Sequence, residues 1–128
     1  MADPTPSQKW LEYASNDLSW TKANLTEQVW YGACFTSQQA AEKALKAYLI
    51  SKDEAIKKIH DLRVLVERCL NIDPDFEKLR DSCISLNFYY IPARYPDIGE
   101  FTDFTEDKAR EAYQLAKEIV EFVEEKLR

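Results

Sequence analysis

The sequence predicts an all-α protein, an antiparallel up-and-down four-helix bundle with one additional short helix. Only two glycines and five prolines interrupt its 128 residues, and the hairpin dipeptides Asn-Gly and Asp-Gly do not occur. Apolar residues recur every three or four positions over long stretches, which is the spacing of one face of an α-helix. A chain of this length buries one hydrophobic core. We therefore expect five helical segments in a single domain.

The first two helices follow from this spacing. Residues 1–6 are polar and contain two prolines, so we expect a flexible tail, followed by the single domain over residues 7–128. A first helix is predicted over residues 7–27 and a second over residues 29–51. The apolar stripe of the first helix consists of Leu11, Ala14, Leu18, Thr21 and Leu25.

Three further helices are predicted after a polar connection over residues 52–59. Asp61 is a favourable N-cap for the third helix, and Asp73-Pro74 ends it. The fourth helix begins near Phe76 and ends before Pro92, because proline disfavours helical geometry in the residue before it. The fifth helix begins after a loop over residues 91–102, with Thr105 as its N-cap. The inward positions are Leu62, Leu65, Val66, Cys69 and Leu70; Phe76, Leu79, Cys83, Leu86 and Tyr90; and Ala109, Ala112, Tyr113, Ala116, Val120, Val123 and Leu127.

Charge and composition exclude several classes of protein. The net charge of −6 argues against a broad nucleic-acid-binding surface, which needs clustered basic residues. Cys34, Cys69 and Cys83 lie at apolar helical positions and are expected to be buried free thiols. His60 is the single histidine, and the carboxylates near it lie in no recognised metal-ligand spacing. We therefore expect neither a metal nor a cofactor. No signal peptide or run of membrane length is found, which predicts a cytoplasmic protein.

The second helix places two polar residues on its inward face. At 100° per residue, Gln38 and Glu42 share the face of Leu45. A buried polar group without a partner costs about 1–3 kcal/mol, so partners must come from elsewhere. We predict a buried polar layer made of Gln38, Glu42, Arg80 and Asn87. As an alternative, Glu42 pairs with Lys46 one turn on.

Three blocks occur in a distinctive order: Gln38 to Ala47, then His60-Asp61-Leu62, then Arg94-Tyr95-Pro96-Asp97. Together they resemble the HEPN family of small all-helical domains, from about Trp10 to Leu127. Within the family, the chain resembles the nucleotidyltransferase-associated branch, whose members are similar to the C-terminal helical domain of kanamycin nucleotidyltransferase. This resemblance implies a homodimer and a minimal nucleotidyltransferase as partner, including in toxin-antitoxin pairs.

The implied homodimer agrees with two features of the first two helices. Ala33, Ala40, Ala44 and Ala47 give the second helix a face of small residues that permits close approach of a neighbour. Trp20 lies on the outer side of the first helix. The alternative for the alanines is that alanine is simply the strongest helix former.

The ribonucleases of this family carry an arginine followed, after four to six residues, by a histidine. Residues 53–55 occupy the required positions before His60, and none of them is arginine. Arg80 precedes Asn87 by seven positions, but an amide does not titrate near neutral pH and cannot act as general acid or base. We therefore predict no catalytic residues. The alternative is a ribonuclease toxin that acts on RNA as a dimer, using Arg80, Asn87, and His60 or Arg94.

The principal hypothesis is a non-catalytic module that binds a nucleotide or a similar small anionic ligand. Arg94 offers a planar fork for phosphate, and Tyr95 a stacking surface. In a second hypothesis, Arg94 and Asp97 only attach the loop to the helix ends. In a third hypothesis, the protein is a scaffold whose polar layer sets the register of the helices. The candidate ligand-binding residues are Lys43, Lys46, His60, Arg94, Tyr95 and Asp97.

Overall fold

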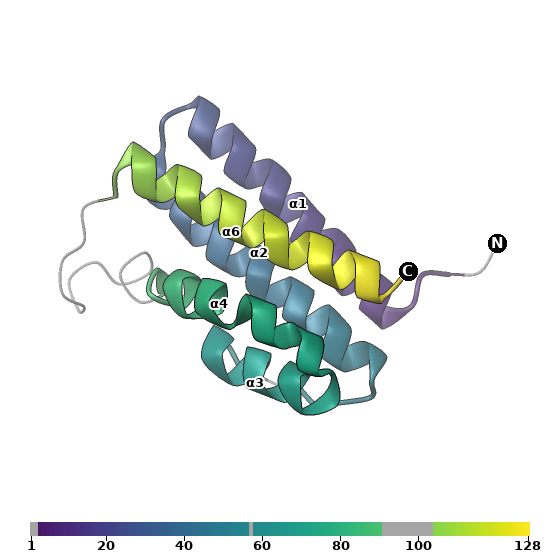
Figure 1. Ribbon diagram of the computed structural model, residues 1–128. Helices are drawn as coiled ribbons and strands as arrows, with labels where there is room; N and C mark the ends of the chain where they lie inside the picture. Colours follow the sequence, from purple (N-terminus) through teal and green to yellow (C-terminus); the bar gives the residue numbers. More distant parts are fainter. Residues whose placement is uncertain (1–2, 57, 91–103) are drawn as a thin grey trace.

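The computed structural model describes residues 3–56, 58–90 and 104–128, and these ranges contain five α-helices, a short 3-10 segment and no strand. The all-α prediction is therefore confirmed. The elements are α1 (Pro6–Thr26), α2 (Trp30–Ser51), α3 (Leu62–Ile72), η1 (Pro74–Leu79), α4 (Arg80–Asn87) and α6 (Glu106–Lys126) (Figure 1). No described helix is both long enough and apolar enough to cross a bilayer. The predicted loop over residues 91–102 lies outside the described residues.

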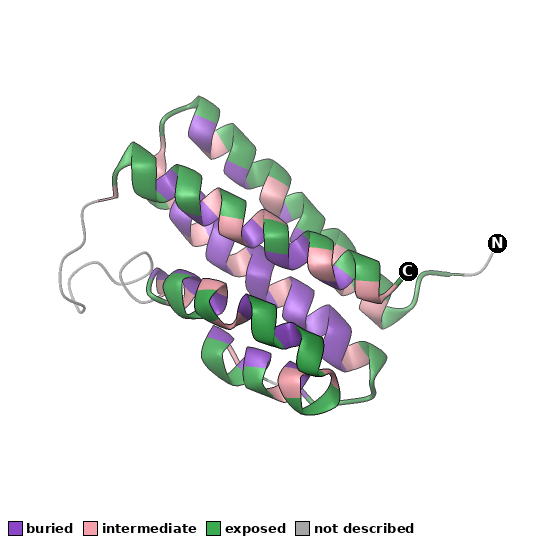
Figure 2. Cartoon of the chain, viewed as in Figure 1, coloured by how far each residue is buried: buried purple, intermediate pink, exposed green. Residues whose placement is uncertain are grey.

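Helix α2 is the centre of the bundle. It lies between α1 and α6 on one side and α3 and α4 on the other (Figure 1), and it is buried along most of its length (Figure 2). Ala33, Ala40, Ala44 and Ala47 are all fully buried within the single chain. Their small side chains let the bundle's own helices approach closely, so this face is not available to a second subunit.

Helix α1 begins one residue earlier than predicted. The Thr5 side chain accepts a hydrogen bond from the Gln8 backbone N–H, and the Gln8 side chain accepts one from the Thr5 backbone N–H. This capping box, with Pro6 in the first turn, starts the helix inside the segment predicted to be a tail. The Ser7 hydroxyl also donates to the Ala47 carbonyl, which ties the start of α1 to α2.

Helix α3 runs in the same direction as α2. His60 lies beside Glu42, the Cys69 thiol lies 3.9 Å from the Leu45 carbonyl, and the Phe76 ring lies 4.5 Å from the Tyr48 ring. Later residues of the segment from His60 to Phe76 therefore contact later residues of α2, as expected for two segments that run in the same direction. The connection between the two helices must return along α2 before α3 begins, and this return places His60 beside the middle of α2.

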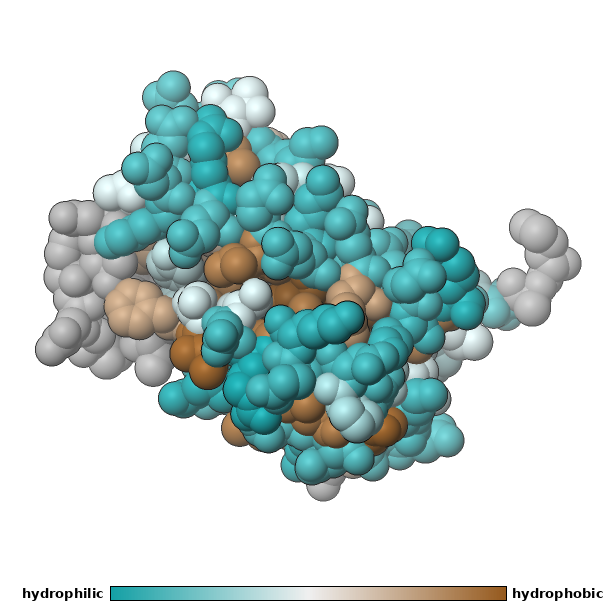
Figure 3. Space-filling view, in the orientation of Figure 1, coloured by the Kyte–Doolittle hydropathy of each residue, from teal (hydrophilic) through white to brown (hydrophobic). Residues whose placement is uncertain are grey.

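The predicted fourth helix is divided in two. The 3-10 segment η1 begins where the Asp73 side chain accepts from the Asp75 backbone N–H, and α4 follows at Arg80. Phe76 in η1 is fully buried and contacts the rings of Tyr48 at 4.5 Å and Phe122 at 5.0 Å, so it joins η1 to α2 and α6. On the face that Figure 3 presents, apolar surface gathers between α6 and α4, bordered by hydrophilic side chains.

Candidate functional site

A cluster of polar side chains lies around one carboxylate of α2. Glu42 Oε2 accepts from Lys46 Nζ at 2.9 Å and contacts His60 Nδ1 at 3.0 Å. Gln38 Nε2 lies 3.5 Å from the other oxygen, Oε1. Gln38 in turn accepts from Gln39 Nε2 at 2.6 Å. Gln38, Glu42, Lys46 and His60 are called the Glu42 cluster below.

The ion pair inside the Glu42 cluster is removed from water. Glu42 is 5% exposed and Lys46 3% exposed, although lysine and glutamate are almost never buried without a partner. The Lys46 ammonium also lies 5.6 Å from the centre of the Trp10 ring, at cation-π distance. Glu42 and Lys46 therefore neutralise each other, and removing one of them would leave a buried, uncompensated charge.

His60 joins the Glu42 cluster to the surface. Its side chain is 42% exposed, while its Nδ1 atom contacts the buried Glu42 carboxylate. Its ring lies nearly parallel to the Tyr90 ring, with centroids 5.8 Å apart and an interplanar angle of 12°. The imidazole is thus oriented by a hydrogen bond at one edge and an aromatic contact on one face. Sequence reasoning placed Tyr90 on the inward face of a helix and missed its contact with His60.

Arg80 does not belong to the buried layer in which it was predicted. Its guanidinium forms ion pairs with Glu67 of α3 and with Glu77 of η1, and its side chain is 37% exposed. Arg80 is the first residue of α4 and meets one acidic residue of α3 and one of η1. The cation that neutralises Glu42 is instead Lys46, from the same helix.

Asn87 is engaged at the start of α3. Its side-chain oxygen accepts a hydrogen bond from the Leu62 backbone N–H at 2.9 Å. The first N–H groups of a helix have no partner within the helix, and here one of them is satisfied by the last residue of α4. Asn87 therefore joins two antiparallel helices. The prediction that it meets Gln38 and Glu42 is corrected, because its amide faces the backbone of α3.

Lys43 is held by a second ion pair on α2. Its ammonium lies 2.7 Å from a carboxylate oxygen of Asp17, which is buried between α1 and α2. Asp17 was not among the residues predicted for the site, although its position in the sequence places its side chain on the inward face of α1. It lies three residues after Ala14 and four before Thr21, both of which are buried. The predicted ligand-binding residues Arg94, Tyr95 and Asp97 lie outside the described residues.

A comparison with family models gives one decisive result. The model of the HEPN domain matches residues 7–126. The chain belongs to the HEPN family. The crystal structure of TT1696 from Thermus thermophilus is similar to this HEPN chain at 36% identity and a TM-score of 0.84, over 94% of this chain and 97% of that one.

A second solved structure supports the same fold. ST0689, described as an archaeal HEPN homologue, is 26% identical with a TM-score of 0.77, over 98% of this HEPN chain and all of its own. A comparison with curated proteins gives no match.

The described part of this HEPN domain shows no arrangement for metal chemistry or thiol chemistry. No group of three or more histidine, cysteine, aspartate or glutamate side chains there is placed to hold a metal ion. Cys34, Cys69 and Cys83 are free and buried, as predicted. Burial raises the pKa of the Cys34 and Cys83 thiols to about 12, and it also raises the pKa of Cys69. These thiols therefore stay protonated and unreactive near neutral pH.

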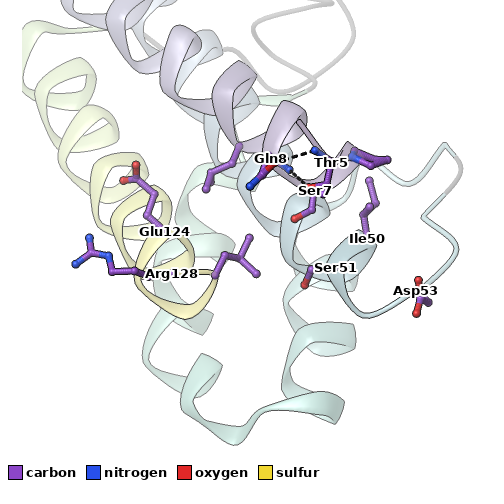
Figure 4. Close-up of a pocket in the computed structure, with 11 residues that line it drawn as sticks. Thr5, Ser7, Gln8, Ile50, Ser51, Asp53, Glu124 and Arg128 are labelled. Atoms are coloured by element: carbon purple, nitrogen blue, oxygen red, sulfur yellow. Dashed lines mark hydrogen bonds between the residues drawn. The ribbon is translucent and has the colours of Figure 1, made fainter. Parts of the chain in front are cut away.

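An open hollow of about 740 Å³ lies where α1 begins and where α2 and α6 end (Figure 4). Four of its polar lining residues form hydrogen bonds at helix ends. The Ser51 hydroxyl donates to the Tyr48 carbonyl, Ser7 donates to Ala47, and Thr5 and Gln8 form the capping box. Of the predicted ligand-binding residues, Lys43, Lys46 and His60 lie in the described part of the chain, and none of these three lines the hollow, so we place the candidate site at the Glu42 cluster.

Proposed function

We propose that this HEPN domain is a non-catalytic cytoplasmic module that binds a nucleotide or a similar small ligand and pairs with a minimal nucleotidyltransferase, including in a toxin-antitoxin system. One observation carries the non-catalytic assignment. Arg80 and Asn87, the pair closest to the ribonuclease signature in this chain, are both engaged in structural contacts, with two glutamates and with the start of α3.

The contacts of the two lysines narrow the proposed ligand site. Lys43 is paired with Asp17 and Lys46 with Glu42, and both carboxylates are buried. Lys46 is 3% exposed, so a ligand phosphate would have to displace the Glu42 carboxylate to reach its ammonium, which would leave that carboxylate unpaired. Lys43 is partly exposed, but the charge of its ammonium is already compensated by Asp17. We therefore assign ligand contact to His60 and Tyr90, together with Arg94, Tyr95 and Asp97, which follow Tyr90 closely in the chain.

The outer face of α1 supports the proposed partnership. Tyr13 and Trp20 lie seven residues apart on this helix and are 52% and 59% exposed. Tyrosine and tryptophan are enriched at protein interfaces because they bury a large area at a small cost in conformational entropy. We assign this face to contact with a second protein chain, either the nucleotidyltransferase or a second copy of the domain.

Two measurements test the proposal. Calorimetry with a panel of nucleotides should show saturable binding, and the purified domain should leave structured RNA intact. RNA cleavage that disappears in Arg80→Ala would contradict the non-catalytic assignment, and no binding of any nucleotide would contradict the ligand assignment.

A third measurement tests the partnership. The domain should co-purify with a minimal nucleotidyltransferase encoded beside it. Trp20→Ala should weaken this association, whereas Phe88→Ala, which truncates a similarly exposed aromatic residue at the end of α4, should not. Equal retention by both variants would remove α1 from the interface. The molar mass in solution, measured by light scattering, would show whether the domain also forms the expected homodimer.

A further inference from the structure

We propose that Glu42 fixes His60 in the tautomer that carries its proton on Nδ1, so that Nε2 accepts a hydrogen bond from a hydroxyl or amino group of the ligand. This inference rests on the proposed function and specifies the chemistry of the same site. His60 would be the recognition residue. Glu42 and Lys46 would be positioning residues that do not touch the ligand.

The direction of the hydrogen bond between His60 and Glu42 follows from the carboxylate. An ionised carboxylate only accepts hydrogen bonds, so a contact of 3.0 Å requires a proton on Nδ1. Glu42 is held in its ionised form by the Lys46 ammonium at 2.9 Å, which is itself buried and would otherwise be uncompensated. A neutral imidazole that carries its proton on Nδ1 has a lone pair on Nε2.

The ring is also fixed in space. Its Nδ1 edge faces the buried Glu42 and one face lies against Tyr90, while 42% of the side chain is exposed. We infer that Nε2, which does not contact Glu42, belongs to the exposed part of the ring. Among the described residues, the hydrogen bond of the His60 side chain to Glu42 is made through Nδ1 and leaves Nε2 uninvolved. His60 Nε2 is thus a hydrogen-bond acceptor whose orientation is set by the contacts of the ring with Glu42 and Tyr90.

This geometry favours ligand groups that donate a hydrogen bond over ligand groups that only accept one. While the imidazole is neutral, a phosphate oxygen, which only accepts hydrogen bonds, would meet the Nε2 lone pair with repulsion. A ribose hydroxyl or an exocyclic amine donates, and it would find an oriented acceptor that loses little entropy on binding. Because Lys46 is neutralised by Glu42, the cluster adds little attraction for an anion. We therefore assign His60 to the nucleoside part of a nucleotide rather than to its phosphate.

The tautomer is directly measurable, because His60 is the single histidine of the chain. Nitrogen-15 NMR of histidine-labelled protein, at about pH 8.5 where free imidazole is neutral, distinguishes the two tautomers by the shifts of the two ring nitrogens. We expect the form protonated on Nδ1. A spectrum of the form protonated on Nε2 would overturn the inference.

A pair of double variants isolates the role of Glu42. Glu42→Leu with Lys46→Met removes the carboxylate without leaving a buried charge, and should shift His60 toward the tautomer protonated on Nε2. Asp17→Leu with Lys43→Met removes a comparable ion pair between α1 and α2, and should leave the His60 spectrum unchanged. If both double variants altered the tautomer equally, the cause would be a general loss of packing in the domain, and Glu42 would not be a positioning residue.

Ligand titrations test the assigned chemistry with adenosine, AMP and inorganic phosphate as probes. Adenosine and AMP should move the Nε2 resonance, and inorganic phosphate alone should not. His60→Phe keeps a ring against Tyr90 and should weaken AMP binding about tenfold, the effect of losing one oriented hydrogen bond. Unchanged AMP affinity in His60→Phe would refute this inference and leave the proposed function standing. Failure of the wild-type protein to bind AMP or any other nucleotide would refute the proposed function itself.

Discussion

Glu42 and His60 lie 18 positions apart in the chain, and their side chains meet at 3.0 Å. The contact exists because the connection after α2 returns along that helix before α3 begins. A buried ion pair, Glu42 with Lys46, is thereby linked to a half-exposed imidazole at the surface. The structural centre of the domain and its candidate ligand contact are therefore one connected network.

The Glu42 cluster should dominate the response of stability to single substitutions. Glu42→Leu should lower the free energy of unfolding by about 3–5 kcal/mol, because it leaves the Lys46 ammonium buried and unpaired. The double variant Glu42→Leu with Lys46→Met should recover most of this loss, since no uncompensated charge remains. Urea unfolding followed by circular dichroism measures both. A double variant no more stable than the single one would show that charge burial is not the cause.

Asn87 should contribute to stability through α3. Asn87→Ala removes the acceptor for the Leu62 backbone N–H and should cost about 0.5–2 kcal/mol, the range of a lost helix cap. Ser85→Ala, at an exposed position of the same helix, is the matched control and should change stability by less than about 0.5 kcal/mol. Equal effects of the two substitutions in urea unfolding would argue that Asn87 does not stabilise the start of α3.

Phe76 should be the most sensitive aromatic residue of the core. Phe76→Ala empties a fully buried position between the rings of Tyr48 and Phe122 and should cost about 3–5 kcal/mol. Phe88→Ala deletes the same side chain at an exposed site at the end of α4 and should be nearly neutral. Thermal unfolding of the two variants provides the comparison. A small loss for Phe76→Ala would mean that η1 is not anchored by this residue.

Lys126 should control the response of stability to acid. Its hydrogen bond lowers the pKa of Asp73 below the ordinary 3.8, and its ammonium lies 2.8 Å from Asp73 and 2.6 Å from Asp75. A lowered carboxyl pKa contributes stability that is fully present above the unfolded-state pKa and is lost as pH falls through the folded-state pKa. Lys126→Met should therefore be less stable than wild type near neutral pH, with a difference that narrows below about pH 4.

Urea unfolding at a series of pH values measures this difference. Arg110→Met, which breaks the exposed pair between Arg110 and Glu106 on the same helix, serves as the control. If the gap between Lys126→Met and wild type stayed constant down to about pH 2, the coupling of Asp73 to Lys126 would be refuted.

Local sequence predicted much of this molecule correctly. Apolar spacing gave four of the helices to within a few residues, while the fourth predicted helix is divided into η1 and α4. The N-caps Asp61 and Thr105 stand where they were expected. The buried positions of Gln38 and Glu42 were also predicted. Each of these properties depends on residues within about two turns of one another, because helical periodicity and capping are short-range geometry.

The interaction partners of the polar residues were harder to predict from the sequence. Arg80 was expected beside Glu42, but the charge that Glu42 needs comes from the alternative partner, Lys46 on the same helix. Arg80 pairs with Glu67 and Glu77 instead. Which residues meet depends on the direction and rotation of neighbouring helices, and periodicity along one helix contains neither.

By itself, therefore, the sequence determined a helical domain with two polar groups directed into its core. Lys46, one turn along the same helix, was the alternative partner that the sequence offered for Glu42, whereas tertiary structure decided which distant residues meet these groups. The return of the chain along α2 brings His60 to Glu42, and the division of the fourth helix into η1 and α4 turns Arg80 toward Glu67. Contacts between residues distant in the chain arise from packing the whole core at once, because each helix can take its place only when the shapes of all its neighbours are satisfied.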